Sequence, residues 1–177
     1  KLDLYHLPQN GLGMPLDSNS KIVVTIHDLI PYAMPETVGK GYLDKFLKEM
    51  PKIISSCSGI ITVSEYSKND ILRFFPNFPS EKIYVTPLAA NESFKPIEKE
   101  SCKNVIKNLF KIDSPFILYL GGFSSRKNVK SLILAFKKII KDLPNDYKLV
   151  LGGTLQDEGF TLQKIVTDNN LENNVIF

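Results

Sequence analysis

Tryptophan is absent from the 177 residues, and cysteine and histidine occur only twice each. The two cysteines, Cys57 and Cys102, lie far apart and form no Cys-x-x-Cys pair, so the sequence lacks a zinc-binding pattern. A disulfide-stapled miniature protein is also excluded, because such scaffolds are dense in cysteine. We therefore expect free, mostly buried thiols and a reducing compartment.

Long hydrophobic runs and a strong charge of one sign are missing too. No apolar run approaches the roughly 18 to 20 residues that cross a bilayer, and no signal-peptide pattern is visible. The net charge of +3 comes from 22 basic and 19 acidic residues that are well mixed, so nucleic acid is not an expected partner. The 43% hydrophobic and 23% charged residues are typical of a globular protein.

Short runs rich in Ile, Val, Tyr and Phe recur along the chain and predict buried strands. The predicted strands are 2–5, 22–26, 60–63, 83–86, 116–120, 147–151 and 174–177. Longer amphipathic stretches lie between most of them. This alternation predicts an α/β fold with parallel sheets.

Apolar residues spaced three or four positions apart predict the helices. The predicted helices are 42–57, 65–75, 129–140 and 160–169. Ser64 is expected to cap the second of them, and Pro76 to end it. Pro51 predicts a kink in the first helix, and Gly59 a cap at its end.

The strand and helix rhythm breaks between residues 87 and 115. Three prolines and a charge cluster at 98–100 lie in this stretch, together with a short predicted helix over 102–110. We interpret it as a connection between two α/β units. Each unit is too small to be a complete doubly wound domain.

In open α/β sheets, ligands bind beyond the carboxyl ends of the strands. The polar and glycine residues that follow predicted strands directly are His27, Asp28, Ser64, Gly121, Gly122, Gly152 and Gly153. His27 is the sharpest single candidate, although a lone histidine at a strand end is more often a hydrogen-bonded structural residue. The sequence contains no Gly-x-x-x-x-Gly-Lys-Ser/Thr motif and no Gly-x-Gly-x-x-Gly fingerprint.

The stretch 120–128, LGGFSSRKN, has the chemistry of a diphosphate site. Gly121 and Gly122 let the backbone approach a ligand, and two serines supply hydroxyl groups. Arg126 offers a fork of donors and Lys127 a point charge, at the start of the next predicted helix. A solvated turn with a basic helix start explains the same residues, and on these residues alone it remains the more economical interpretation.

Four segments resemble a known family. VVTIHDLIPYAMPE, IITVSEYSKNDILRFFP, EKIYVTPLAANESFKP and FILYLGGFSSRKNVKSLILAFKKI occur in the same order as in retaining glycosyltransferases of family 4, especially its mannosyltransferase-like members. The resemblance extends from His6 to Phe177. It implies the GT-B fold, in which two Rossmann-like domains bind the acceptor and the nucleotide-sugar donor respectively.

The resemblance implies a division of the chain into three parts. Residues 1–90 resemble part of the N-terminal, acceptor-side domain, and residues 112–177 resemble the first half of the C-terminal, donor domain, with 91–111 as the linker. The family's N-terminal glycine-rich loop and its C-terminal Glu-x7-Glu segment have no counterpart here. We therefore expect an internal fragment of a longer enzyme, inactive by itself.

Site roles follow from the resemblance residue by residue. Arg126 and Lys127, with Gly121 and Gly122, match the donor-diphosphate site, although many relatives carry Arg where this sequence has Gly122. His27 matches a histidine that contacts the donor sugar and supports transfer, and is the expected catalytic residue. Asp28, Ser64 and Glu65 are expected to line the cleft.

The implied reaction moves a hexose, with mannose favoured, from a GDP- or UDP-linked sugar to a glycan or lipid-linked acceptor with retention. No cofactor is expected, and no metal, because basic side chains can stabilise the departing diphosphate. We expect a cytoplasmic location, with peripheral contact at the inner face of the membrane left open. The alternative is a non-catalytic α/β module that binds nucleotide sugars. A purely structural two-lobe protein explains neither the basic pair nor His27.

Overall fold

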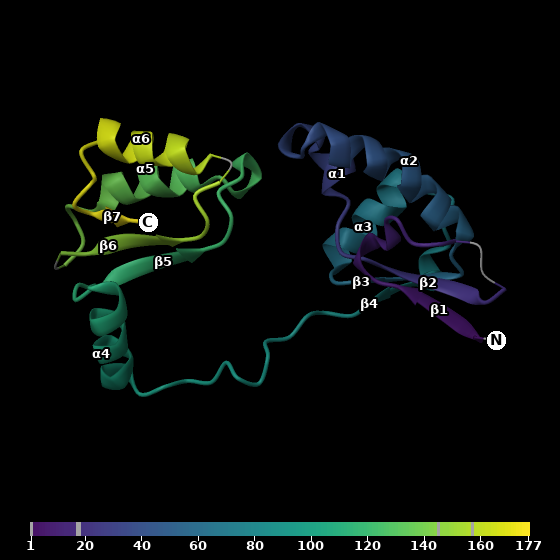
Figure 1. The fold of residues 1–177 in the computed structure, drawn as a ribbon, viewed down its shortest axis with the longest axis horizontal. Helices are drawn as coiled ribbons and strands as arrows, with labels where there is room; N and C mark the ends of the chain where they lie inside the picture. The colour runs from purple at the N-terminus through teal and green to yellow at the C-terminus, as the bar shows by residue number, and fades with distance from the viewer. Residues whose placement is uncertain (1, 17–18, 145, 157) are drawn as a thin grey trace. The chain divides into compact units, whose positions relative to one another are not determined.

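A computed structural model describes residues 2–16, 19–144, 146–156 and 158–177. The chain divides into two compact units, Lys1–Glu92 and Ser93–Phe177, each with its own sheet and helices (Figure 1). The assignment of 1–90, 91–111 and 112–177 to acceptor domain, linker and donor domain stays a prediction. Each unit has a hydrophobic cluster of its own.

Unit 1 contains a parallel sheet, with strands in the order β1-β2-β3-β4 among its described residues. The strands are β1 Leu4–Leu7, β2 Lys21–Ile26, β3 Gly59–Thr62 and β4 Ile83–Val85. The first strand lies two residues later than predicted: it was expected over 2–5, whereas β1 begins at Leu4. The side chains of Leu2 and Leu4 are exposed. Alternate residues of β2 point into the core, and its exposure pattern follows the period of two.

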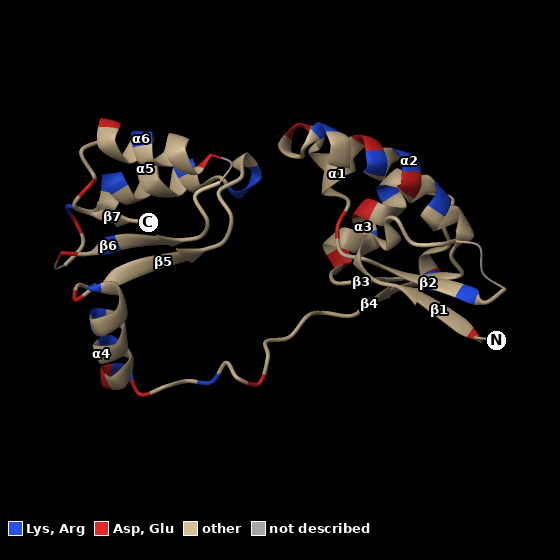
Figure 2. Cartoon of the chain, viewed as in Figure 1, with Lys and Arg blue, Asp and Glu red and all other residues tan. Residues whose placement is uncertain are grey.

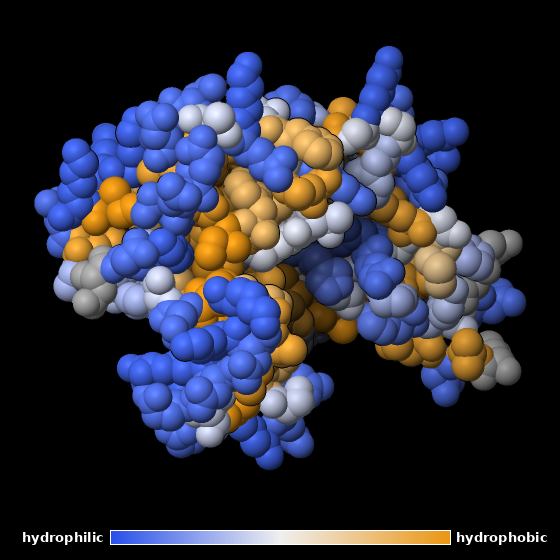
Figure 3. Space-filling view, turned by 60° about the vertical axis from the view of Figure 1, so that its left-hand side comes forward, coloured by the Kyte–Doolittle hydropathy of each residue, from blue (hydrophilic) through white to orange (hydrophobic). Residues whose placement is uncertain are grey.

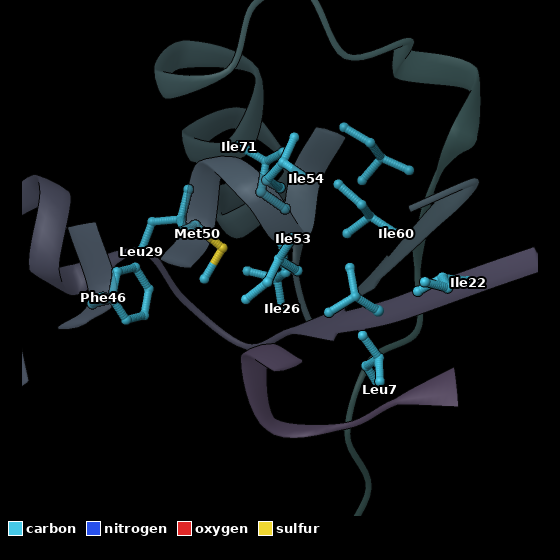
Figure 4. Close-up of a cluster of buried hydrophobic side chains, with 12 residues drawn as sticks. Leu7, Ile22, Ile26, Leu29, Phe46, Met50, Ile53, Ile54, Ile60 and Ile71 are labelled. Atoms are coloured by element: carbon cyan, nitrogen blue, oxygen red, sulfur yellow. The ribbon is translucent and has the colours of Figure 1, made fainter. Parts of the chain in front are cut away.

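The helices of unit 1 are α1 Ile30–Ala33, α2 Lys40–Ser56 and α3 Glu65–Phe74, with short 3-10 turns η1 Gln9–Gly11, η2 Pro35–Thr37 and η3 Ser80–Lys82. Figure 4 shows apolar side chains of α2, among them Met50 and Ile53, facing those of the sheet, such as Ile26 and Ile60. These four side chains are at most 1% exposed. Packing of this kind, rather than helix propensity, is what holds α2 on the sheet.

Pro51 lies inside α2, and the helix continues without a break from Lys40 to Ser56. Gly59 does not cap it, and that prediction was wrong. The cap is Cys57, whose extended backbone ends the helix, and Gly59 is already the first residue of β3. The turn needs no left-handed residue, because Ser58 donates its N–H to the Ile22 carbonyl at 2.7 Å and enters the sheet directly.

Unit 2 contains a second parallel sheet, with strands in the order β5-β6-β7 among its described residues. Its elements are α4 Lys99–Phe110, β5 Phe116–Leu120, η4 Ser125–Lys127, α5 Val129–Ile139, β6 Lys148–Gly152, α6 Gly159–Asp168 and β7 Val175–Ile176. Helices α5 and α6 lie on one face of the sheet (Figure 1). The predicted α/β class with parallel sheets is therefore confirmed in both units.

The segment before unit 2's sheet is exposed, and α4 starts three residues earlier than predicted. The Glu98 carboxylate accepts hydrogen bonds from the N–H groups of Glu100 and Ser101 at 2.9 and 2.7 Å and so caps the helix. Apolar side chains such as Leu109 and Leu120 remain exposed in this unit. Figure 3 accordingly shows hydrophobic surface among the charged side chains.

The two cysteines are less buried than expected. Cys57 and Cys102 are free thiols, as expected, but both are only half-buried. Burial nevertheless raises the pKa of the Cys57 thiol to about 11. None of the helices in the described part of the chain is long and apolar enough to pass through a membrane.

Candidate functional site

The basic loop of unit 2 begins where β5 ends. Gly121 donates its N–H to the Gly152 carbonyl at 2.9 Å, which prolongs the pairing of β5 with β6 into the loop. The Tyr119 hydroxyl donates to the carbonyl of Gly122 at 2.6 Å. Hydrogen bonds to the backbones of Gly121 and Gly122 thus hold both predicted glycines at the carboxyl end of β5, and Gly122 is exposed.

Two buried side chains fix the ends of the basic turn. Phe123 is 1% exposed, and its ring stacks on Tyr119 at 6.3 Å between centroids. Val129, the first residue of α5, is 3% exposed. Between these anchors Arg126 and Lys127 are exposed, and Figure 2 shows the turn before α5 coloured as basic. The fold therefore presents the two cations to solvent on a backbone that is tied down on both sides.

The turn has a defined backbone. Lys127 and Asn128 donate their N–H groups to the carbonyls of Ser124 and Ser125, each at 2.9 Å. Asn128 adopts the left-handed conformation, with φ 51°, and its side chain makes no capping bond. The prediction of a helix start near Asn128 is confirmed. Because the first turn of a helix exposes N–H groups, this position adds positive potential beside the basic pair.

A second glycine loop packs against the first. A Cβ at Gly153 would overlap the carbonyl oxygen of Gly121 and would lie 3.2 Å from Cζ of Phe123. The sequence pointed to Gly153 only as a residue that follows a strand. The structure gives the reason for a glycine there, since the loop after β6 touches the backbone of the basic loop.

In unit 1, His27 follows β2 directly, as predicted, and its peptide is hydrogen-bonded on both sides. Its N–H donates to Oδ1 of Asn10 at 2.9 Å, and its carbonyl accepts a hydrogen bond from Oγ of Ser67 at 3.0 Å. The histidine residue is half-buried. Asn10 and Ser67 belong to segments that are distant in the sequence, η1 and α3.

The other predicted residues of unit 1 lie at the same edge of the sheet. Ser64 caps α3 as predicted, because its Oγ accepts the N–H of Ser67 at 3.1 Å. Glu65, in the first turn of α3, is exposed. Asp28 is half-buried, and its Oδ1 accepts the N–H of Ile30 at 3.1 Å, which starts α1. Sequence reasoning missed α1, although Asp28 followed by Pro31 is a recognisable helix start.

Asn10 and Tyr42 were also missed. Asn10 has a left-handed backbone, with φ 65°, between Gln9 and Gly11, whose φ values of 52° and 68° are also positive. Burial raises the pKa of the Tyr42 phenol, the Asp28 carboxylate raises it further, and a hydrogen bond from the Asn10 side chain lowers it. The Asn10-Gly11 dipeptide is a turn signal that could have drawn attention to this loop.

The structure therefore gathers the predicted residues into two groups. His27, Asp28, Ser64 and Glu65 lie at the carboxyl edge of the sheet of unit 1, and Gly121, Gly122, Arg126 and Lys127 lie at that of unit 2. Their roles remain predictions. In the described ranges, no group of three or more His, Cys, Asp or Glu side chains has the arrangement of a metal site.

One family model matches most of unit 2. Residues 102–177 match the family model of glycosyl transferases group 1. This region includes the whole basic loop. The chain is also similar to mannosyltransferases.

Two curated relatives illustrate the similarity. The O-antigen chain mannosyltransferase B of Escherichia coli is 29% identical over 150 residues, which cover 85% of this chain and 38% of that protein. The serotype-specific mannosyltransferase WbdA of Escherichia coli is 25% identical over 142 residues, or 78% of this chain and 17% of that protein. The chain thus spans well under half the length of these glycosyltransferases.

Solved structures establish the fold. Anabaena Alr3699/HepE, in complex with UDP and glucose, superposes with a TM-score of 0.69 and 18% identity over 89% of this chain and 41% of its own. A glycosyltransferase of Rickettsia africae ESF-5 superposes with a TM-score of 0.63 and 18% sequence identity, over 90% of this chain and 41% of its own. The predicted class, α/β of GT-B type with parts of two Rossmann-like domains, is confirmed.

Proposed function

We propose that the protein transfers a hexose, with mannose favoured, from a nucleotide-diphosphate sugar to a glycan or lipid-linked acceptor with retention of anomeric configuration. The group 1 glycosyltransferase match and the mannosyltransferase relatives support the transferase class and the sugar. The bound UDP and glucose in Alr3699/HepE support a nucleotide-sugar donor. The donor is a GDP- or UDP-linked sugar, and the acceptor lies at the cytoplasmic side of a membrane.

One observation carries the proposal. Arg126 and Lys127 are exposed on a short turn whose ends are fixed by the buried Phe123 and Val129. A binding loop gains affinity when its donors are already in place, and packing of Phe123 and Val129 in the core of unit 2 holds this turn. The same turn lies within the matched residues 102–177.

The basic turn suits the departing group of glycosyl transfer. When the bond between the sugar and the diphosphate breaks, negative charge grows on the diphosphate and positive charge on the sugar. The Arg126 fork, the Lys127 ammonium and the first N–H groups of α5 would stabilise the diphosphate where that charge develops. Charge-assisted hydrogen bonds of this kind contribute about 1.5 to 3 kcal/mol each. The proposed reaction therefore uses no metal or other cofactor.

His27 is the proposed catalytic residue on the acceptor side. Its backbone N–H and C=O groups are hydrogen-bonded and the residue is only half-buried, so His27 is held at the end of β2 and can still meet a ligand. There it would hydrogen-bond the donor sugar and orient it for attack by the acceptor hydroxyl. Asp28, Ser64 and Glu65 would line the surface beside it.

The test is a donor screen with the protein at its native length. GDP-mannose, UDP-glucose and related donors are offered with lipid-linked and free glycan acceptors, and transfer is followed by mass spectrometry. The one-bond C1–H1 coupling of the product reports the configuration of the new bond. A retained configuration supports the proposal, and an inverted one contradicts retention. Tight nucleotide-sugar binding without transfer to any acceptor supports the non-catalytic module instead.

A further inference from the structure

The hydrogen bonds of His27 among the described residues are made by its backbone N–H and C=O groups. Its N–H and its C=O each have one side-chain partner, Asn10 at 2.9 Å and Ser67 at 3.0 Å. We propose that Asn10 and Ser67 are positioning residues, which hold the peptide of His27 and thereby aim its imidazole. This inference rests on the proposed function, in which His27 meets the donor sugar.

The Asn10 side of this arrangement is built into the core of unit 1. Three successive residues of η1 have positive φ, and the last of them, Gly11, is buried. A Cβ at Gly11 would lie 3.3 Å from Cγ2 of Val24 and 3.4 Å from Cγ2 of Ile53. The loop is therefore pressed against the sheet and α2. Asparagine tolerates the left-handed backbone that this path requires and has the acceptor that the His27 N–H needs.

The second hydrogen-bond partner of His27, Ser67, lies in the first turn of α3. Ser67 is 8% exposed, and its hydroxyl donates to the His27 carbonyl. The same hydroxyl accepts a hydrogen bond from Oγ of Ser64 at 3.1 Å, and Ser64 also accepts the Ser67 N–H. The capping residue of α3 thus orients the serine that holds His27. The Ser67 hydroxyl is one hydrogen bond from His27, and the Ser64 hydroxyl is two.

Two substitutions at Asn10 separate its backbone role from its acceptor role. Asn10→Gly keeps the left-handed backbone and removes Oδ1, whereas Asn10→Asp keeps both. We expect Asn10→Gly to lower kcat at least about tenfold, because small displacements of a catalytic group reduce rate strongly. The KM for the donor should change by less than about threefold, since the diphosphate is bound elsewhere. Asn10→Asp should restore most of the kcat.

Ser67→Ala is compared with a matched variant, Thr62→Val. The Thr62 hydroxyl is fully buried and donates to the carbonyl of Ile26 at 2.8 Å, one residue before His27. Both variants remove one buried hydroxyl that donates to a backbone carbonyl, but only Ser67→Ala frees the His27 carbonyl. We expect Ser67→Ala to lower kcat at least about tenfold and Thr62→Val to lower it by less than about threefold. Equal losses in the two variants would contradict the proposal.

Hydrogen exchange at the His27 amide gives a readout that does not depend on activity. Asn10→Gly should speed this exchange at least about tenfold relative to the unsubstituted protein, and Asn10→Asp should not. If no donor is ever transferred, the proposed function fails while the exchange contrast still tests the anchoring. If exchange at His27 is the same in both variants, Asn10 does not hold the peptide. Unchanged kcat in Asn10→Gly with faster exchange would also overturn the positioning role.

Discussion

The backbone of Gly153 lies against the carbonyl oxygen of Gly121, so closely that a side chain at position 153 would occupy the same space. The two residues belong to loops that follow adjacent strands, β5 and β6. Their contact ties the basic loop to its neighbour. The loop that carries Arg126 and Lys127 is therefore set by glycine packing as well as by the burial of Phe123.

Gly153→Ala should destabilise unit 2. The new methyl group must displace the Gly121 carbonyl, and overpacking of this kind costs about 1 to 3 kcal/mol. Gly122→Ala is the comparison, because a Cβ there meets no atom within 4 Å. Urea unfolding of both variants checks this. Equal stability of the two would show that the loops separate without cost.

Gly122→Arg should be tolerated and should strengthen nucleoside diphosphate binding. The site has open space for a Cβ, because a Cβ at Gly122 meets no atom within 4 Å. An added guanidinium beside Arg126 would contribute a further charge-assisted donor. Calorimetric titration with GDP and UDP measures the gain, for which we expect about tenfold or more. Unchanged affinity would place the diphosphate away from Gly122.

Lys127→Ala should lower the rate of transfer at least tenfold, since each factor of ten corresponds to about 1.36 kcal/mol of lost transition-state stabilisation. Lys130→Ala is the matched variant, because Lys130 is also exposed, on the first turn of α5. It removes the same charge from a neighbouring position and should change the rate by less than about threefold. Comparable losses in both variants would reduce the effect to general electrostatics.

His27→Ala should lower turnover more than it weakens nucleotide binding. The hydrogen bonds with Asn10 and Ser67 involve the backbone N–H and C=O of residue 27, so they survive the substitution. The variant should therefore remain folded, with near-normal thermal unfolding. Steady-state kinetics and nucleotide titration on the same preparation separate the two effects. A large loss of stability would instead identify His27 as a structural residue.

The Cys57 thiol should react slowly in the folded protein. Burial holds its pKa at about 11, against an ordinary value of 9.0, so at pH 8 the folded state has about a hundredfold less thiolate than the unfolded chain. The raised pKa also means that its contribution to stability is intact below pH 9 and is lost as the pH rises towards 11. Alkylation by iodoacetamide at pH 8, followed by mass spectrometry with and without urea, measures the difference. Similar rates in the two conditions would contradict the burial of the thiol.

The strands were the easiest part of the fold to predict. The run 22–26 is rich in Ile and Val, and alternate residues of β2 are buried as predicted. The run 116–120 also forms a strand, β5, but the prediction that it is buried was wrong: β5 is an edge strand among the described residues, and Leu118 and Leu120 are exposed. The end of α2 could not be predicted from Gly59, because a glycine signals a left-handed cap only where the backbone turns that way. Here Ser58 joins the sheet at once through the Ile22 carbonyl.

The positions of Arg126, Lys127 and His27 beyond the ends of strands could be predicted from the sequence, and the structure confirms these positions, while their roles stay predictions. The residues that hold them in place could not be predicted. Asn10 and Ser67 become visible only in three dimensions, because each acts through one hydrogen bond to a residue 17 or 40 positions away. The role of Gly153 depends likewise on a neighbouring loop.

The two hydrophobic clusters share no residue, and this bears on how the chain acquires its structure during synthesis. The buried members of the first cluster lie between Leu7 and Ile83, and those of the second between Phe123 and Val175. A ribosome adds residues from the N-terminus, and domains fold largely as units while it does so. Every side chain of the first cluster has thus been made about 40 residues before Phe123 is added. The residues that form the core of unit 1 are therefore all synthesised before those of unit 2, and unit 1 can fold while unit 2 is still being translated.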